Sequence, residues 1–109
     1  MVHATIRMLI PPKRRAEVME ILSSLAERSR FEAGCVSTLV YQDVEVEPAM
    51  LIEQLWKSGE DLDRYLRSEE YRKVLLVVEM AVESPEIRFD EISRSSGVET
   101  IEKARSQTR

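Results

Sequence analysis

Hydrophobic side chains recur with the period of a helix in the second half of the chain, between two segments in which they alternate. The helical part begins near Ser58, whose hydroxyl can cap free backbone N–H groups while Glu60 and Asp61 lie in the favourable field of the first turn. Pro85 ends it, because proline lacks an N–H and disfavours helix in the residue before it. The pattern predicts one long amphipathic helix between two strands. Its expected buried stripe consists of Leu62, Leu66, Val74, Leu75, Val78 and Val82.

The first half of the chain predicts a strand followed by a helix. Apolar residues alternate from Val2 to Ile10, and two prolines end this strand. Pro12 suits the beginning of a helix, where a missing N–H costs nothing. The helix is expected to run to about Phe31, before Gly34, which tolerates the left-handed conformation that ends helices. Its apolar positions are Val18, Ile21, Leu22 and Leu25.

Three further strands complete the expected fold. Residues 35–43 and 49–57 are rich in strand-forming side chains, and the polar residues between them form a turn, so the two strands should be antiparallel. Residues 87–92 alternate and form the last strand. The order βαββαβ predicts an α+β, ferredoxin-like fold, in which a four-stranded antiparallel sheet carries both helices on one face.

The second face of this sheet is expected to be covered as well. A sheet face in contact with water should be polar, but these strands carry large apolar residues on both faces. Leu39 and Tyr41 alternate with other apolar residues of their strand, and Leu51 and Leu55 do so in the next. We therefore predict a homodimer that buries the second face.

The chain divides into a ferredoxin-like domain, residues 1–93, and a polar C-terminal extension, residues 94–109. Residues 93–97 have the composition of a linker. Residues 98–106 can form a short helix that is too small to be stable alone, so it either packs on the partner subunit or frays. The apolar Val98 and Ile101 favour packing.

Composition limits the function classes. The 109 residues fit one domain, and the net charge of −4, with both signs interleaved, disfavours nucleic-acid and polybasic membrane binding. Cys35 is the single cysteine and His3 the single histidine, which excludes an internal disulfide, a cysteine-based zinc site and a histidine cluster for a metal. The sequence shows no signal peptide and no apolar run near the ~20 residues of a membrane span, so a cytoplasmic location is expected.

Two stretches, AGCVSTLVYQDVEVEP from Ala33 and LIEQLWKSGEDLDRYLRSEEYRKVL from Leu51, make the chain similar to a known family. Together with the element order they resemble the antibiotic biosynthesis monooxygenases, which are dimeric α/β barrels. The resemblance implies a homodimer with a pocket between each sheet and its helices. It also implies oxidation of multi-ring phenols or quinols by O₂ without metal, flavin or haem.

The resemblance also points to site residues. Trp56 is retained and can stack on an aromatic ligand, although a core or interface role would also explain it. Tyr65 stands where family members usually carry a histidine, and Gln54 stands where they commonly carry a glutamate. Tyr65 can donate a hydrogen bond to a phenolic oxygen, but an ordinary tyrosine loses its proton only near pH ~10. Because the second helix has no histidine to anchor iron, haem degradation is not expected.

Residues on the first two strands complete the candidate set. His3 and Arg7 share a strand face and can bind and deprotonate an acidic phenol, or they can be polar residues of the dimer-facing surface. Tyr41 can contact the substrate or contribute to packing. The candidate catalytic residues are Trp56, Tyr65 and His3, and the candidate substrate-binding residues are Trp56, Tyr65, Arg7, Tyr41 and Gln54.

Three functions are compatible with this set. The first is a monooxygenase, independent of any cofactor, that acts on quinol-like or polycyclic phenolic compounds. The second is a non-catalytic dimeric module that binds a small hydrophobic ligand or a partner protein. The third is an isomerase or lyase, which would need an acid–base pair such as His3 with Glu53 on one wall of the pocket.

Overall fold

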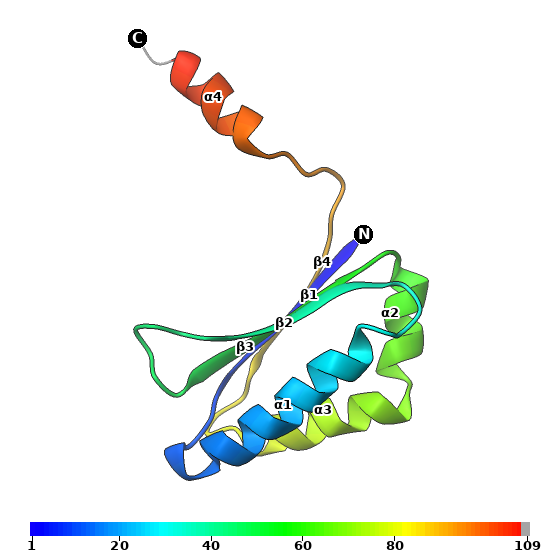
Figure 1. The fold of residues 1–109 in the computed structure, drawn as a ribbon, viewed down its shortest axis with the longest axis vertical. Helices are drawn as coiled ribbons and strands as arrows, with labels where there is room; N and C mark the ends of the chain where they lie inside the picture. The colour runs from blue at the N-terminus through cyan, green and yellow to red at the C-terminus, as the bar shows by residue number, and fades with distance from the viewer. Residues whose placement is uncertain (108–109) are drawn as a thin grey trace.

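Four antiparallel strands form one sheet, and helices cover one of its faces (Figure 1). The computed structural model describes residues 1–107. The strand order across the sheet is β2-β3-β1-β4, with β4 at one edge. The strands are β1 (Val2–Leu9), β2 (Cys35–Gln42), β3 (Ala49–Trp56) and β4 (Glu86–Glu91). This arrangement confirms the predicted ferredoxin-like α+β fold.

The helices follow the predicted order, but the single predicted second helix is two helices in the structure. A 3₁₀ turn, η1 (Pro12–Arg14), leads into α1 (Arg15–Ser29), and Gly34 ends this part of the chain with a φ of 84°. The second half contains α2 (Gly59–Leu66), α3 (Glu69–Glu79) and α4 (Val98–Ser106). In Figure 1, α1, α2 and α3 lie on one side of the sheet and α4 lies on the other side, away from it.

The prediction of a single long second helix was wrong, because the chain breaks at Ser68 into α2 and α3. The Ser68 hydroxyl accepts a hydrogen bond from the backbone N–H of Tyr71 and donates one to the carbonyl of Tyr65, 2.6 Å away. Ser68 thus caps a new helix where the sequence pattern continued the old one.

The break also changes which side chains are buried. Helix α3 starts a new period, in which Val74 and Val77 point into the core and Leu75 is 48% exposed. Val82 lies beyond the end of α3 and is 64% exposed. The predicted stripe was therefore wrong at Leu75 and Val82, because it was extrapolated through a break in the helix.

Two clusters of buried side chains lie between the sheet and α1–α3. The larger joins alternate residues of β1 and β3 to α1 and α3: Ile6, Met8, Ile10, Val18, Leu22, Leu25, Met50, Ile52, Val74 and Val77. The smaller lies at the α2 end of the sheet: Val2, Ala4, Trp56, Leu62 and Tyr65. The sheet therefore has a helix-covered face and an opposite face, called the open face below.

Candidate active site

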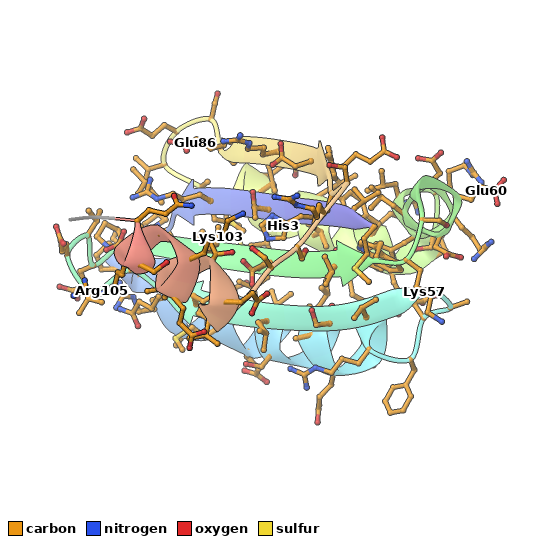
Figure 2. All side chains as sticks on the ribbon, turned by 90° about the horizontal axis from the view of Figure 1, so that it is seen from above. His3, Lys57, Glu60, Glu86, Lys103 and Arg105 are labelled. Atoms are coloured by element: carbon orange, nitrogen blue, oxygen red, sulfur yellow. The ribbon has the colours of Figure 1, made fainter. Side chains whose placement is uncertain are left out.

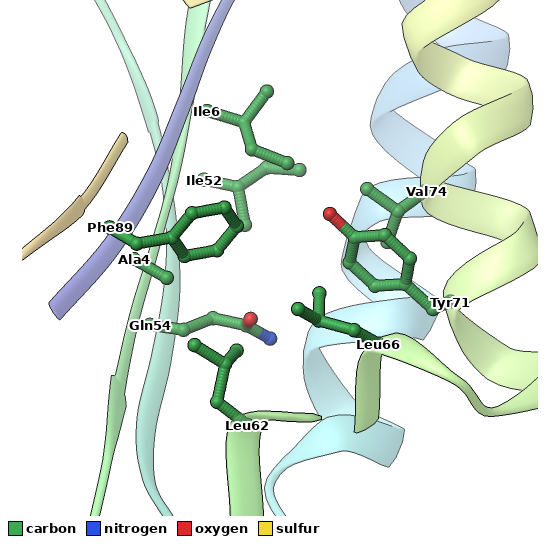
Figure 3. A pocket seen from close by; sticks show the side chains of 9 residues that line it. All are labelled: Ala4, Ile6, Ile52, Gln54, Leu62, Leu66, Tyr71, Val74 and Phe89. Carbon is green, nitrogen blue, oxygen red and sulfur yellow. The ribbon is translucent and has the colours of Figure 1, made fainter. Parts of the chain in front are cut away.

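A pocket lies between the helix-covered face of the sheet and helices α2 and α3 (Figure 3). Its empty space is about 300 Å³ with the mouth included, but only about 10 Å³ is open to the centre of a water molecule. That is room for about one water, so a ring ligand must displace side chains on entry. The lining residues are Ala4, Ile6, Ile52, Gln54, Leu62, Leu66, Tyr71, Val74 and Phe89.

Gln54 is the polar side chain that β3 directs into this pocket (Figure 3). Its Oε1 accepts a hydrogen bond from Trp56 Nε1 at 3.3 Å, and its Nε2 donates to Thr38 Oγ1 at 3.3 Å. Thr38 Oγ1 lies 2.9 Å from the Ser29 hydroxyl. These buried contacts fix the orientation of the amide and leave one N–H and one oxygen lone pair for a ligand.

The rings of Trp56 and Tyr65 stack behind the pocket. Their centroids are 4.8 Å apart at an interplanar angle of 31°, and the Tyr71 ring meets the Tyr65 ring edge-on at 5.4 Å. Trp56 is 0% exposed and does not line the pocket. In this conformation a ligand therefore contacts Tyr71, and Trp56 acts through the orientation of Gln54.

The Tyr65 hydroxyl is buried and has no hydrogen-bond partner. Burial raises its pKa to about 12. Gln54 lies near and lowers the pKa in part, although the two side chains do not make a hydrogen bond of normal geometry. Tyr65 therefore keeps its proton at physiological pH and cannot act as a general base there. A buried hydroxyl without a partner has an unused donor, which a water or ligand oxygen would satisfy.

The other predicted site residues lie on the open face, so the structure separates them from the pocket. Cross-strand pairing places His3 opposite Leu55 and Arg7 opposite Leu51, whereas Val2 pairs with Trp56. Because neighbouring residues of a strand point to opposite faces, the sheet lies between His3 and Trp56. The register therefore places His3 and Arg7 on the opposite face of the sheet from Trp56.

The open-face residues form polar clusters of their own. His3 Nε2 lies 3.0 Å from Glu53 Oε2, and the Tyr41 hydroxyl donates to Glu53 Oε1 at 3.4 Å. Partial burial and the Glu53 carboxylate raise the pKa of Tyr41. Arg7 Nη2 lies 3.5 Å from Asp43 Oδ2. The His3–Glu53 pair of the isomerase or lyase hypothesis thus exists, but on the face of the sheet that carries no helix.

Sequence reasoning missed most of the pocket walls, including Tyr71 and Phe89. Phe89 lies on the edge strand β4, pairs with Ala4 across to β1, and is 46% exposed at the pocket. The small Ala4 leaves the space beside this ring. The sequence did show an aromatic residue in a strand that was expected to pack against the helices. It could not show which residue of β1 lies beside Phe89, because that depends on the strand register.

Neither a metal site nor a membrane span is found in the described part of the chain. Within residues 1–107, no three His, Cys, Asp or Glu side chains lie close enough together to hold a metal ion. None of the described helices is long and apolar enough to cross a membrane.

The fold and pocket define a small α+β domain that holds a mostly apolar cavity between its sheet and helices. The model of the family described as antibiotic biosynthesis monooxygenase matches residues 1–75, well over half of the chain. The chain therefore belongs to the antibiotic biosynthesis monooxygenase family. No curated protein matches the chain by sequence.

Solved structures agree on the fold. A protein from Deinococcus radiodurans, provisionally named an antibiotic biosynthesis monooxygenase, superposes with a TM-score of 0.82 at 18% identity, over 89% of this chain and 97% of that one. Rv0793 from Mycobacterium tuberculosis gives 0.79 at 18% identity, over 88% and 98%. A conserved protein from Methanosarcina mazei gives 0.77 at 25% identity, over 83% and 90%.

Proposed function

We propose that this protein is a monooxygenase that oxidises quinol-like or polycyclic phenolic compounds with O₂ and needs no cofactor. Family membership supports the reaction class. The observation that carries the proposal is a narrow apolar pocket with one oriented amide, Gln54, beside a buried tyrosine hydroxyl that has no partner. Such a pocket suits a flat aromatic ring with a single polar edge.

The substrate itself supplies the electrons in this reaction. A phenolate ring transfers one electron to O₂, and the two radicals combine at a ring carbon that carries one hydrogen. The resulting peroxide takes up the proton that the phenol released, and loss of water from this hydroperoxide gives a carbonyl, so the product is a quinone. One oxygen atom of O₂ remains in the product, and the other leaves as water with the ring hydrogen and that proton. The protein binds the ring and excludes bulk water from the radical pair.

No side chain of the pocket can remove the phenolic proton. The lining residues are apolar apart from Gln54 and Tyr71, and burial raises the pKa of Tyr71 above its usual value. The substrate must therefore ionise in water or on entry. We expect the rate to rise with pH up to the pKa of the substrate phenol, so substrates of different acidity should give different pH profiles.

Oxygen uptake tests the proposal directly. Purified, metal-free protein is mixed with reduced naphthoquinols and anthracene-type phenols under ¹⁸O₂, and uptake and label in the product are followed. We expect one labelled oxygen per product, loss of most activity in Gln54→Leu, and no change in the matched surface variant Gln107→Leu. Uptake that persists unchanged in Gln54→Leu would place the reaction outside this pocket.

A non-catalytic binding module is the second candidate, because Tyr65, which stands where the family resemblance implies a histidine, stays protonated. The same compounds would then quench the fluorescence of Trp56 without oxygen uptake. Quenching that Gln54→Leu weakens, with no uptake at any pH from 6 to 9, would establish binding in place of catalysis.

We also propose that the protein is a homodimer in which the open faces of two sheets pack together. Leu39 and Tyr41 are 43% and 44% exposed there, beside Leu51 and Leu55 on β3. An apolar sheet face of this kind is stable when another layer covers it. Light scattering should give a dimer for the wild type, a monomer for Leu39→Glu, and a dimer for the control Phe31→Glu, whose side chain is 91% exposed.

A further inference from the structure

Helix α4 is the part of the described chain that makes the fewest contacts with the rest. All of its residues are exposed, including the apolar Val98 at 65% and Ile101 at 59%. These two residues are three apart and form one stripe. A nine-residue helix is marginal in water by itself, so α4 requires a surface that covers this stripe.

The chain's own sheet does not provide that surface. Figure 1 shows α4 on the open-face side of the sheet, away from it, and Figure 2, which looks onto that face, shows α4 in front of the strands. The helix-covered face is on the far side. The space next to α4 is therefore the side on which a second copy would pack in the proposed dimer.

The second copy offers an uncovered apolar surface on its edge strand β4. Ile87 and Phe89 pair with Ile6 and Ala4, so they point to the helix-covered face, yet they are 47% and 46% exposed. Phe89 also lines the pocket, opposite Tyr71 (Figure 3). A helix laid over these two side chains would cover the strand and close one side of the pocket.

Charge and length fit this contact. Residues 79–91, around β4, carry five acidic side chains and one arginine, whereas residues 94–109 carry four basic and two acidic side chains. The six residues between β4 and α4 can span about 20 Å when extended. Packed sheets are about 10 Å apart, so this linker is long enough to pass the edge of a partner's sheet.

We infer that α4 of each protomer packs on β4 of the other, over Ile87 and Phe89, and forms part of the wall of the partner's pocket. The inference rests on the homodimer proposed above. It adds an exchange of the C-terminal arms, and it makes each pocket dependent on residues from two chains. Val98 and Ile101 supply the apolar contact, and the basic side chains of α4 face the acidic residues next to β4.

Disulfide trapping tests the contact. The variant Ile101→Cys with Phe89→Cys, in a Cys35→Ser background, is oxidised gently and examined on a non-reducing gel. A second pair, Ile101→Cys with Ile87→Cys, is tested in case the two cysteines of the first pair are in contact but cannot reach disulfide geometry. Each single-cysteine variant controls for symmetric pairs. The pair Ile101→Cys with Phe31→Cys controls for random collisions, because Phe31 is more exposed than Phe89 and Ile87 but lies next to β2, at the other edge of the sheet from β4.

We expect covalent dimers from both test pairs and at least tenfold less from the controls. Loss of thiols with a monomeric band would mean that α4 folds back on its own β4, which overturns the exchange. A wild type that is dimeric by light scattering but gives no disulfide also overturns it, and leaves the dimer intact. A monomeric wild type would instead reject the dimer itself.

Ligand affinity gives a second measurement. Ile101→Glu should weaken binding of a naphthoquinol at least threefold in the dimer, because the partner's wall no longer closes the pocket. Val44→Glu makes the same chemical change at a fully exposed position between β2 and β3, and it should have no effect. Equal affinities in the two variants would show that α4 does not contribute to the pocket.

Discussion

Replacement of Tyr65 by phenylalanine should stabilise the folded protein and weaken its binding of phenols. The side chain is 2% exposed and its hydroxyl has no partner, so the native state bears the desolvation cost of that group. An unsatisfied buried hydroxyl costs about 1–3 kcal/mol. Phenylalanine keeps the stacked ring on Trp56 and loses only the hydroxyl. We therefore expect the free energy of unfolding to rise by about 1 kcal/mol.

Urea unfolding at fixed protein concentration, followed by Trp56 fluorescence, measures this change. Tyr71→Phe is the matched control, because the Tyr71 hydroxyl is not among the unsatisfied atoms, and its effect should stay within about 0.5 kcal/mol.

The raised pKa of Tyr65 also makes the stability of the protein depend on pH. The folded state holds this proton longer than the unfolded state, so stability is complete below pH ~10 and falls as pH rises toward 12. Tyr65→Phe should show a smaller decline, because burial also raises the pKa of Tyr71 and that contribution remains. A loss of 1 kcal/mol or more in Tyr65→Phe would refute the reasoning, because it would reveal a partner for the hydroxyl.

Three further predictions concern stability. Gly34→Ala should destabilise the fold by more than about 1 kcal/mol, because φ is 84° and a Cβ would lie 2.2 Å from the carboxyl carbon of Asp61. In the same urea assay the control Gly59→Ala should be neutral or stabilising, because a Cβ there would have no atom within 4 Å. Ser68→Ala should cost about 1 kcal/mol through loss of the α3 cap, and a change below about 0.3 kcal/mol would contradict that role. The backbone N–H groups of Val46 and Glu45 hold the pKa of Asp43 below its usual range. Stability from this carboxylate is present above pH ~4 and is lost as pH falls through the lowered pKa, so Asp43→Asn should flatten the dependence of stability on pH between about 2 and 4.

The sequence predicted the local structure correctly where a single residue pattern was enough to identify the strand, turn or helix end. Alternation from Val2 predicted β1, and Gly34 marked a left-handed position that the structure places at φ 84°. Ser58 was expected to cap a helix, and its side chain accepts a hydrogen bond from Asp61 N–H. These features depend on a few neighbouring residues, so short-range physics is enough to predict them.

The break at Ser68 and the burial of Tyr65 required tertiary structure. A serine within a helical pattern is compatible with an exposed position, a cap or a kink, and only packing of α2 and α3 against different parts of the sheet selects the cap. Tyr65 has one apolar neighbour at helical spacing, Leu62, while Asp61, Ser68 and Glu69 at the other such positions are polar, so the pattern does not mark Tyr65 as fully buried. Its stacking on Trp56 joins residues of two elements and follows from how α2 lies on β3.

The candidate site shows most clearly what the sequence alone determined. Alternation correctly placed His3 and Arg7 on one face of β1, but it could not show on which face Trp56 of β3 would lie. That depends on the register, in which Trp56 pairs with Val2 and Leu55 pairs with His3. A shift of one residue would exchange the two faces of a strand. The sequence thus determined the elements and their alternation, and the tertiary pairing of strands decided which of the predicted residues meet in the pocket.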